Sequence, residues 1–438
     1  MAIDNKDKKV LKSSIEREQN EVACSAECEK IKGSKNLNVP PLRFPEFSGE
    51  WKCTTIGNIG DIKNGPFGSV LHAEDYVKNG IPIVTTEHFK TGLMPSDKFG
   101  IPQVSNEDYI RLKGYRLETN DIVFSRVGSV DINAHVGIEQ NGWLFSGRVL
   151  RVRPKYDIDS LFLHYALSTE AVKRDIRNRA VGQTMPSINT PILSSTTIQL
   201  PKDLFEQKKV AHFLRLLDKR IITQNKIIED LKKLKSAISK HLFARKDLLE
   251  TTICLSNIAT LKNGYAFQSG KYNALGKWKI LTITNVSGER YINDEDYNCI
   301  INLPNDIQDH QVLKEGDILI SLTGNVGRVS LCKDGDYLLN QRVGLLQLAK
   351  NVNQEFLYQI LSSQRFENSM IACGQGAAQM NIGKGDVESY VLPYSSNVNN
   401  ILLVAKILHS YDEYIINEQR KLTLLTMQKQ YFLAQMFI

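Results

Sequence analysis

An internal repeat constrains the fold of this 438-residue chain more than any other feature. Segments of the first half recur in the same order in the second half, with a period of 192–199 residues. The matched segments are 58–65 with 257–264, 121–125 with 317–321, 128–130 with 324–326, 148–149 with 342–343, 187–189 with 379–381, and 200–201 with 392–393. Because the repeat spans most of the chain, we expect two similar units.

Each half opens with short β-branched or aromatic runs that are broken by Gly, Asn and Asp, a pattern typical of strands and turns. The clearest predicted strands are 81–85, 121–126, 143–152, 278–283 and 318–323, and helical stretches are predicted at 159–178 and 353–369. The sequence therefore predicts the α+β class, with two β-rich mixed globular domains.

Each half ends in a long helix whose apolar residues recur every 3.5 residues, which predicts a coiled-coil seam rather than a helix lying on a globular core. Adding 194 to each seam position of the first helix gives the seam of the second. The apolar seam residues are Val210, Leu214, Leu217, Ile221, Ile228, Leu231, Ile238, Leu242, Val404, Leu408, Tyr411, Ile415, Leu422, Leu425, Phe432 and Met436. The polar interruptions fall at matching places, at Gln224 and Lys235 and at Glu418 and Lys429.

We expect the two helices to pair as an antiparallel coiled coil that separates the domains in a pseudo-twofold arrangement. In that pairing Glu418 would face Lys235, and Gln224 would approach Lys429. Each helix would be on the order of 55–60 Å long at 1.5 Å per residue. Successive major-groove sites on one face of DNA repeat every ~34–36 Å, so such a helix pair could act as a ruler between two DNA-binding domains.

These patterns divide the chain into five segments. They are a flexible leader (1–38), a first globular domain (39–201), a first long helix (202–248), a second globular domain (249–395) and a second long helix (396–438).

Composition limits the function classes. The net charge of +7 favours a polyanionic partner only mildly. The chain has no apolar run long enough for a membrane span and does not begin with a signal peptide, and its seven cysteines are scattered, so we expect a cytoplasmic protein with reduced thiols. Cys24 and Cys28 have no second cluster of zinc ligands, so no metal site is predicted.

Several motifs along the chain together resemble one protein family. The first is a set of residues in and before the first long helix: Leu200-Pro201, 206–211, Leu217-Asp218, Ile221, Leu231, Lys235 and Leu242-Phe243. This order resembles the central conserved region of the specificity subunits of type I restriction–modification enzymes. The segment 42–47 with Trp51 resembles the start of the first target-recognition domain, and 316–321 with Gly324 and Gly327 resembles a motif of the second. The resemblance covers about residues 40–438. It departs at 399–401, where Asn-Asn-Ile replaces the Glu-Gln-Lys of 206–208.

This resemblance implies a non-catalytic subunit in which each target-recognition domain binds one half of a split double-stranded DNA sequence. The conserved helices would fix the spacing and hold two methyltransferase subunits, and two motor-nuclease subunits could join. The cofactors would belong to the partners, with S-adenosylmethionine in the methyltransferase and ATP and Mg in the motor-nuclease, and none would bind to this chain.

The sequence itself contains no phosphate-binding G-x₄-G-K-[ST] loop and no Asn-Pro-Pro-aromatic motif of adenine methyltransferases. The segment 374–379 approaches G-x-G-x-x-G but lacks the third glycine, which favours a turn or a loop that touches DNA. Two alternatives remain open: an enzyme whose site these motifs do not describe, and an interaction protein that acts through its coiled coil alone.

Candidate DNA contacts are cations for phosphates and amides, hydroxyls or arginines for bases, placed at predicted strand ends. In the first domain they are Lys63, Asn64, Thr85, Thr86, Arg126, Ser129, Arg148, Gln183 and Thr184. In the second they are Lys262, Asn263, Tyr265, Thr284, Asn285, Thr323, Asn325, Arg342, Gln375 and Gln379.

Each candidate also has a structural interpretation. Gly-Asn and Thr-rich positions are common in turns, and Arg148 and Arg342 fall within predicted strands, where both copies would keep them for stability. The first long helix is strongly basic over 208–246, with twelve Lys or Arg against three Asp or Glu. A solvated helix face, DNA along the helix, or an acidic partner would each account for that charge.

Overall fold

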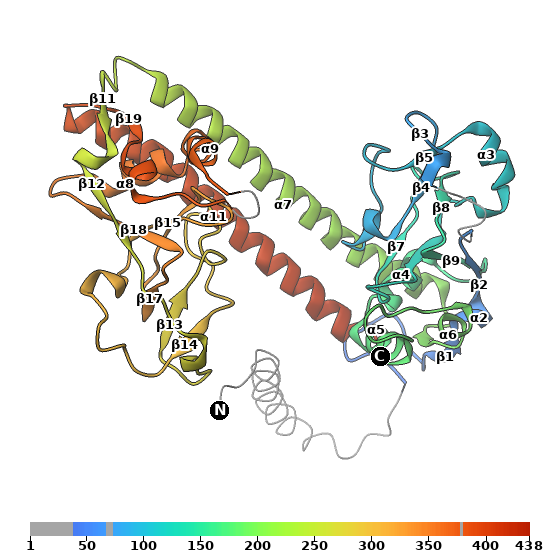
Figure 1. Cartoon of the computed structure of the whole chain (residues 1–438). Coiled ribbons are helices and arrows are strands. Elements are labelled where there is room, and N and C mark those ends of the chain that lie inside the picture. Colours follow the sequence, from blue (N-terminus) through green and yellow to red (C-terminus); the bar gives the residue numbers. More distant parts are fainter. Residues whose placement is uncertain (1–37, 67–72, 377–379) are drawn as a thin grey trace. The chain divides into compact units, whose positions relative to one another are not determined.

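The computed structural model describes residues 38–66, 73–376 and 380–438 (Figure 1). These residues form two compact units. Among the described residues, the N-terminal unit contains those from 38 to 224 and from 421 to 438, and the C-terminal unit contains those from 225 to 420. The leader expected at 1–38 lies outside the described residues except for Asn38.

The N-terminal unit is built on an antiparallel sheet in the order β2-β9-β6-β7. A second sheet has the order β3-β5-β4-β8, with β4 and β8 parallel, and β1 pairs with β10. The strands are β1 (Lys52–Thr55), β2 (Gly60–Asn64), β3 (Tyr76–Val77), β4 (Ile81–Val84), β5 (Gln103–Val104), β6 (Ile122–Ser125), β7 (Asn133–His135), β8 (Leu144–Phe145), β9 (Val149–Pro154) and β10 (Thr197–Leu200). The helices of the globular part are α2 (Ile56–Ile59), α3 (Asn106–Arg111), α4 (Ser160–Leu167), α5 (Glu170–Arg179) and α6 (Thr190–Ser194), with 3-10 turns at Ala73–Asp75, Thr86–Phe89 and Lys113–Tyr115.

The C-terminal unit repeats this topology with the antiparallel sheet β12-β18-β15-β16. Its second sheet has the order β14-β13-β17, with β13 and β17 parallel, and β11 pairs with β19. The strands are β11 (Thr251–Cys254), β12 (Ala259–Asn263), β13 (Trp278–Leu281), β14 (Asn298–Ile300), β15 (Ile318–Ser321), β16 (Val329–Leu331), β17 (Tyr337–Leu339), β18 (Val343–Leu348) and β19 (Val391–Tyr394). The helices are α8 (Gln354–Leu361), α9 (Gln364–Cys373) and α10 (Lys384–Glu388), with 3-10 turns at Leu255–Asn257, Ser269–Lys271 and Asp309–Gln311.

The central strands β6 and β15 are buried on both faces, which explains their continuous apolar sequences. Ile122 and Phe124 of β6 pack in the same core as helix α4, whereas Val123 faces a second core with Phe145 of the other sheet. In β15, Ile318 and Ile320 pack with α8 and Leu319 faces the second core. Each unit is therefore one sheet with helices on one face and a smaller sheet on the other, which confirms the α+β class.

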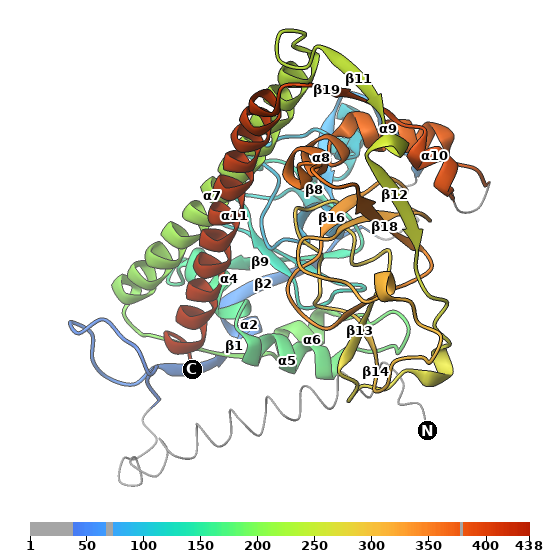
Figure 2. The same ribbon diagram turned by 90° about the vertical axis from the view of Figure 1, so that its left-hand side faces the viewer.

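Two long helices complete the units: α7 (Leu204–Ala244) and α11 (Val398–Gln435). The boundary between the units falls within both helices, so each unit contains one segment of each. Within each unit the two segments lie side by side and antiparallel (Figures 1 and 2). In the N-terminal unit Phe213 meets Phe432 with ring centroids 4.8 Å apart, and in the C-terminal unit Lys235 meets Asp412.

The predicted seam positions are all buried or half-buried, but they do not form a helix-only seam. Val210, Leu214 and Leu217 belong to the core of the N-terminal unit together with Met436. In the C-terminal unit the core includes Val404, Leu408 and Leu242. The interpretation that the heptads exclude packing on a globular core was therefore wrong, because the same positions serve both contacts.

The predicted polar pairs across the helices were also wrong. Lys235 pairs with Asp412 instead of Glu418, and Lys429 pairs with Asp218 instead of lying beside Gln224. The heptad pattern indicates which face of each helix is buried. It does not determine the register, that is, how far one helix is shifted along the other.

Several predicted elements are interrupted in the structure. The strand expected over 143–152 is two strands, β8 and β9, separated by the turn at Ser146–Arg148. The helical stretches expected over 159–178 and 353–369 are the helix pairs α4 with α5 and α8 with α9, and Thr169 and Ser363 precede the second helix of each pair. The Ser363 hydroxyl caps its helix by accepting from the Phe366 N–H at 3.5 Å, which favours a new helix start over a continuous helix, whereas the Thr169 hydroxyl makes no such bond.

Candidate nucleic-acid interface

Polar residues from several strands of the N-terminal unit meet at one end of its main sheet. Asn64 at the end of β2 is paired with Leu150 of β9, and the Arg126 N–H at the end of β6 donates to the Arg148 carbonyl at 2.9 Å. The Ile188 N–H in turn donates to the Arg126 carbonyl at 2.9 Å. We call this the N-terminal strand-end surface; it comprises Asn64, Arg126, Ser129, Arg148 and the loop 181–187.

The C-terminal unit repeats these backbone contacts. The Leu322 N–H donates to the Arg342 carbonyl at 3.0 Å, and the Ile382 N–H donates to the Leu322 carbonyl at 2.9 Å. The C-terminal strand-end surface comprises Asn263, Thr323, Asn325, Arg342 and Gln375. Gln379 was also predicted here, but it lies outside the described residues.

The repeated Lys-Asn-Gly motif that ends β2 and β12 has a steric reason. A Cβ added at Gly65 would overlap the carbonyl oxygen of Ser146, and one at Gly264 would overlap that of Asn340. Only glycine permits this close approach of two backbones. The motif therefore holds Lys63 and Lys262 beside the strand-end surfaces.

Arg148 and Arg342 lie immediately before strands β9 and β18, not within them as predicted. Both are exposed, and neither makes an ion pair with a described residue. The arginines farther along β9 differ, because Arg151 is 5% exposed and pairs with Asp61, and Arg153 binds Asp121 at 2.7 Å. This contrast favours a ligand contact for Arg148 and Arg342 over a structural role.

Some of the remaining predicted residues of the N-terminal unit have exposed side chains, and others have side chains that contact the protein itself. Ser129, Gln183 and Thr184 are exposed. Thr85 caps a 3-10 turn and lies next to the surface, because the Ser146 N–H donates to the Val84 carbonyl at 2.9 Å; Thr86 is half-buried within that turn. Lys63 lies over the Tyr115 ring at 5.1 Å, and Arg126 donates to the Gly147 carbonyl at 3.1 Å.

In the C-terminal unit one predicted contact is wrong. Asn285 is 2% exposed, and its side-chain amide donates hydrogen bonds within the protein to the carbonyls of Asn293 and Asp296 at 2.8 Å. This side chain is therefore not accessible to DNA. Thr284 beside it is exposed, as are Asn263, Asn325 and Gln375. Lys262 and Thr323 are half-buried.

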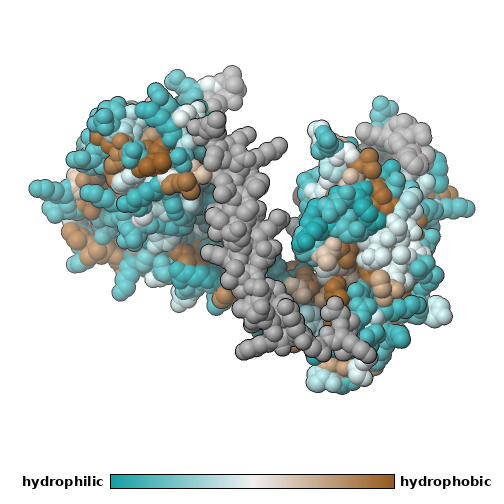
Figure 3. Space-filling view, turned by 90° about the horizontal axis from the view of Figure 1, so that it is seen from below, coloured by the Kyte–Doolittle hydropathy of each residue, from teal (hydrophilic) through white to brown (hydrophobic). Residues whose placement is uncertain are grey.

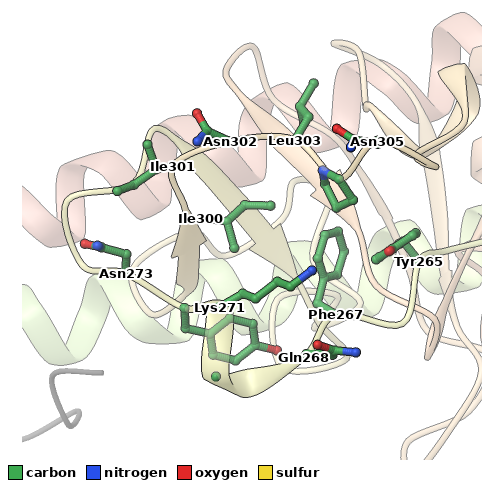
Figure 4. Close-up of a pocket in the computed structure, with 13 residues that line it drawn as sticks. Tyr265, Phe267, Gln268, Lys271, Asn273, Ile300, Ile301, Asn302, Leu303 and Asn305 are labelled. Atoms are coloured by element: carbon green, nitrogen blue, oxygen red, sulfur yellow. The ribbon is translucent and has the colours of Figure 1, made fainter. Parts of the chain in front are cut away.

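Tyr265 borders a pocket of about 460 Å³ beside the C-terminal strand-end surface. Figure 4 shows Lys271 extended across this pocket toward Phe267, with Asn273, Asn302 and Asn305 around the rim. The Tyr265 hydroxyl donates to Asp306 at 2.8 Å, so the ring is held in place. Aromatic faces, amides and one cation suit contact with a sugar–phosphate backbone or a base.

Sequence reasoning missed exposed residues on the same surfaces. Gln341 lies between Asn340 and Arg342 and is exposed, and its neighbour Arg342 was the available signal. The loop 181–187 also exposes Val181 and Met185, at 66% and 63%. Apolar side chains on a DNA-facing loop can contact thymine methyl groups. On the face shown in Figure 3 hydrophilic residues predominate, and hydrophobic ones form small groups.

The described residues offer little for other chemistry. No group of three or more His, Cys, Asp or Glu among them could hold a metal ion, and none of the described helices is long and apolar enough to cross a membrane. The described cysteines, Cys53, Cys254, Cys299, Cys332 and Cys373, are free thiols, and Cys24 and Cys28 lie outside the described residues.

Comparison with known proteins gives one consistent answer. Residues 48–233 and 250–427 each match the family of the type I restriction modification DNA specificity domain. The chain is 27% identical over 354 residues to the type I restriction enzyme MjaVIII specificity subunit of Methanocaldococcus jannaschii, covering 75% of this chain and 78% of that protein. It is 34% identical over 207 residues to a putative type I specificity subunit of Mycoplasma pneumoniae, covering 47% and 48% of the two chains.

Solved structures agree on the fold. The S subunit of a type I restriction–modification system from M. genitalium matches with a TM-score of 0.55 at 17% identity, covering 91% of this chain and 99% of that one. A chain from a study of type I R-M complex assembly matches with a TM-score of 0.53 at 15% identity, covering 90% and 98%.

Proposed function

The chain belongs to the type I restriction modification DNA specificity family, and on this premise we propose that it is the DNA sequence-recognition subunit of a type I restriction–modification system. It is non-catalytic, as are the specificity subunits it resembles, and it acts with DNA and with the partner subunits of such a system. Each globular domain binds one half of a bipartite target, and the paired helices fix the distance between the halves.

One observation carries the proposal of two unlike half-sites. The two strand-end surfaces have the same cations at the positions suited to phosphate contacts. Lys63 corresponds to Lys262, and Arg148 corresponds to Arg342. The positions that could contact bases differ: the backbone hydrogen bonds align Arg126, which is half-buried, with Leu322, which is 7% exposed and packs in the core. Phosphate contacts carry no sequence information whereas base contacts do, so the two domains share a way of binding DNA but select different bases.

The difference continues along the same loops. Val127 aligns with Thr323 and Ser129 with Asn325, while Gly128 and Gly324 are kept. A hydroxyl or an amide at these positions can bond base edges in the major groove, and a valine cannot.

The long helices supply the surface for the partners. In the N-terminal unit α7 and α11 form an apolar groove lined by Phe213, Leu216 and Leu424. In the C-terminal unit Leu402 and Leu403 of α11 are 48% and 47% exposed. Large apolar side chains that are exposed on a helix surface are typical of protein contacts. We therefore propose that each unit binds one methyltransferase subunit, which gives two subunits for the whole chain.

The proposal extends to cofactors and location. S-adenosylmethionine would be bound by the methyltransferase, and ATP with Mg by motor-nuclease subunits where these join, so this chain needs none of them. Its DNA target implies action in the cytoplasm.

A domain exchange tests the split-target proposal. Residues 50–200 are replaced by the corresponding domain of another family member, and the methylated sequences are determined by whole-genome detection of modified bases in cells that contain the methyltransferase. The expected result is a new first half-site, an unchanged second half-site and an unchanged gap. A change in both half-sites would overturn the proposal of independent domains.

A further inference from the structure

The groove in the N-terminal unit is lined by apolar side chains, which we call its floor, and by cationic side chains, which we call its rim. Its volume is about 1050 Å³, and Leu216 and Leu424 on its floor are 47% and 65% exposed. Lys219 and Arg220 line its rim, and neither makes an ion pair with a described residue. An exposed apolar floor of this kind is stabilised when a partner covers it.

The helix segments of this unit expose cations and no carboxylate. Segments 204–224 and 421–438 contain seven Lys or Arg and two acidic residues. Both acidic side chains are buried and paired, Glu206 with Arg43 and Asp218 with Lys429. Every remaining charged side chain on these two segments is therefore positive, and of these Lys209 pairs with Glu46 of the globular domain.

The matching helix segments of the C-terminal unit differ in charge. At the offset of 194 residues, the position of Lys208 is occupied by Leu402, that of Lys219 by Glu413, and that of Arg220 by Tyr414. Segments 225–244 and 398–420 also contain seven Lys or Arg, but they have five acidic residues, of which only Asp412 is buried. The two helix faces are thus related by the repeat but unequal in charge.

Two kinds of acidic partner could bind the cations of this groove, DNA and an acidic helix, and the apolar lining favours the helix. DNA would gain from the cations, but its phosphates would gain nothing from Leu216, Leu424 and Phe213 beneath them. A helix with an apolar stripe flanked by Asp or Glu would use both features. We propose that the N-terminal groove binds an acidic amphipathic helix of the methyltransferase partner, and that the two docking faces of this chain are therefore unequal in salt sensitivity.

This inference rests on the proposed function, and it predicts stepwise loss of partners. Salt screens exposed charge pairs and leaves apolar contacts in place. Raising the salt from 0.1 to 0.5 M should weaken binding at the N-terminal groove by roughly tenfold and affect the C-terminal face less. A complex with two methyltransferase subunits at low salt should become a complex with one.

The experiment counts bound partners by sedimentation velocity, with the full chain and its cognate methyltransferase subunit, at 0.1 and 0.5 M NaCl. The double variant Lys219→Glu with Arg220→Tyr gives the N-terminal groove the residues of the other copy. It should weaken one of the two binding events at 0.1 M salt by roughly tenfold and reduce the salt dependence of that event. The reciprocal variant, Glu413→Lys with Tyr414→Arg, should make the second event more salt-sensitive.

Two controls separate charge from folding. Lys52→Glu changes an exposed cation on β1, away from the groove, and should leave both binding events unchanged. Leu424→Asp removes part of the apolar floor and should abolish one event at every salt concentration.

The outcomes distinguish this inference from the proposed function. If no methyltransferase binds at any salt, the proposed function fails. If two copies bind with equal salt dependence in the original chain, the unequal faces are refuted and the proposed function stands. If the double variant weakens DNA binding by the isolated subunit and leaves partner binding unchanged, the groove is a DNA surface and the inference is overturned.

Discussion

Lys235 of α7 donates a 2.6 Å hydrogen bond to Asp412 of α11, and the side chains of both residues are largely buried, at 18% and 8% exposure. Asp412 also accepts from Arg290 at 3.0 Å and from Gln359 at 2.6 Å. One carboxylate therefore joins the two long helices to helix α8 of the globular domain. In the C-terminal unit this group sets the orientation of the domain on its helices.

The N-terminal unit contains the repeated form of this group. Asp218 accepts from the Tyr165 hydroxyl at 2.6 Å and pairs with Lys429 at 2.5 Å. The offset of 194 relates Tyr165 to Gln359, Asp218 to Asp412, and Lys235 to Lys429. The duplication thus extends to single hydrogen bonds, although Asp218 has one cationic partner among the described residues and Asp412 has two.

This difference predicts unequal stability losses. Asp412→Ala should lower the free energy of unfolding of its unit by about 3–5 kcal/mol, because it leaves Lys235 largely buried without a counter-charge and leaves Arg290 with Glu355 as its remaining partner. Asp218→Ala should cost about 1–3 kcal/mol, since Lys429 is more exposed. Urea unfolding followed by circular dichroism measures both losses, and equal losses would show that Arg290 contributes little.

The two unpaired arginines should control affinity rather than fold. Arg148→Ala and Arg342→Ala are each expected to weaken binding to the target DNA and to lower the slope of log affinity against log salt by about one unit, as the loss of one phosphate contact does. Arg245→Ala is the control, because that exposed arginine already pairs with the exposed Asp247 and its removal leaves no buried charge. Fluorescence anisotropy at several salt concentrations gives the slopes, and unchanged slopes for both variants would refute the phosphate contacts.

The sequence was sufficient to predict the duplication, the α+β class and the antiparallel long helices, because each leaves a periodic signal. Val210 and Val404 show why the prediction of a seam between the helices alone was wrong. Their heptad positions identify a buried stripe, but burial against the domain core and burial against the other helix leave the same pattern. Which of the two covers a residue depends on tertiary packing.

The candidate contacts remain predictions, but the structure shows which of them are accessible. Arg148 and Arg342 were chosen because both copies retain the arginine, and both are exposed, whereas Asn285 was chosen by residue type alone and is buried. The buried position of Asn285 depends on the carbonyls of Asn293 and Asp296, which the chain brings back through a turn that no local pattern reveals. Residue type predicts what a side chain can bond, and only the fold determines whether its partner is DNA or protein.

The Lys-Asn-Gly motif should be intolerant of any side chain at its glycine. Gly65→Ala and Gly264→Ala are each expected to cost about 1–3 kcal/mol, because the new methyl group must displace the backbone at Ser146 or Asn340. The displaced backbone precedes Arg148 or Arg342, so the same variants should weaken DNA binding. Gly100→Ala is a matched control with nothing within 4 Å of its Cβ, although its φ of +74° adds some strain. Thermal melting and anisotropy on each variant check the expectation.

The N-terminal unit should lose stability in mild acid because of the buried His164 and the half-buried His135. Burial lowers the pKa of His164 from 6.5 to about 3, with His135 adding a smaller repulsion, and burial lowers the pKa of His135 to about 4. The ring nitrogen Nδ1 of His164 lies 2.6 Å from the Asn133 side-chain oxygen, which suits a neutral ring that donates.

The direction of this pH dependence follows from the lowered pKa values. Above pH 6.5 both histidines are neutral whether the chain is folded or unfolded, so the stability they support is fully present. As the pH falls below 6.5, only the unfolded chain takes up protons, and each histidine removes about 1.4 kcal/mol per pH unit until its folded pKa is reached. His164→Gln keeps a donor for Asn133 and cannot titrate, so the variant should show a shallower loss between pH 7 and 5. The aligned residue of the other copy is Tyr358, so the C-terminal unit gives an internal comparison in the same urea titrations. An unchanged slope in His164→Gln would mean that other groups govern the acid sensitivity of this unit.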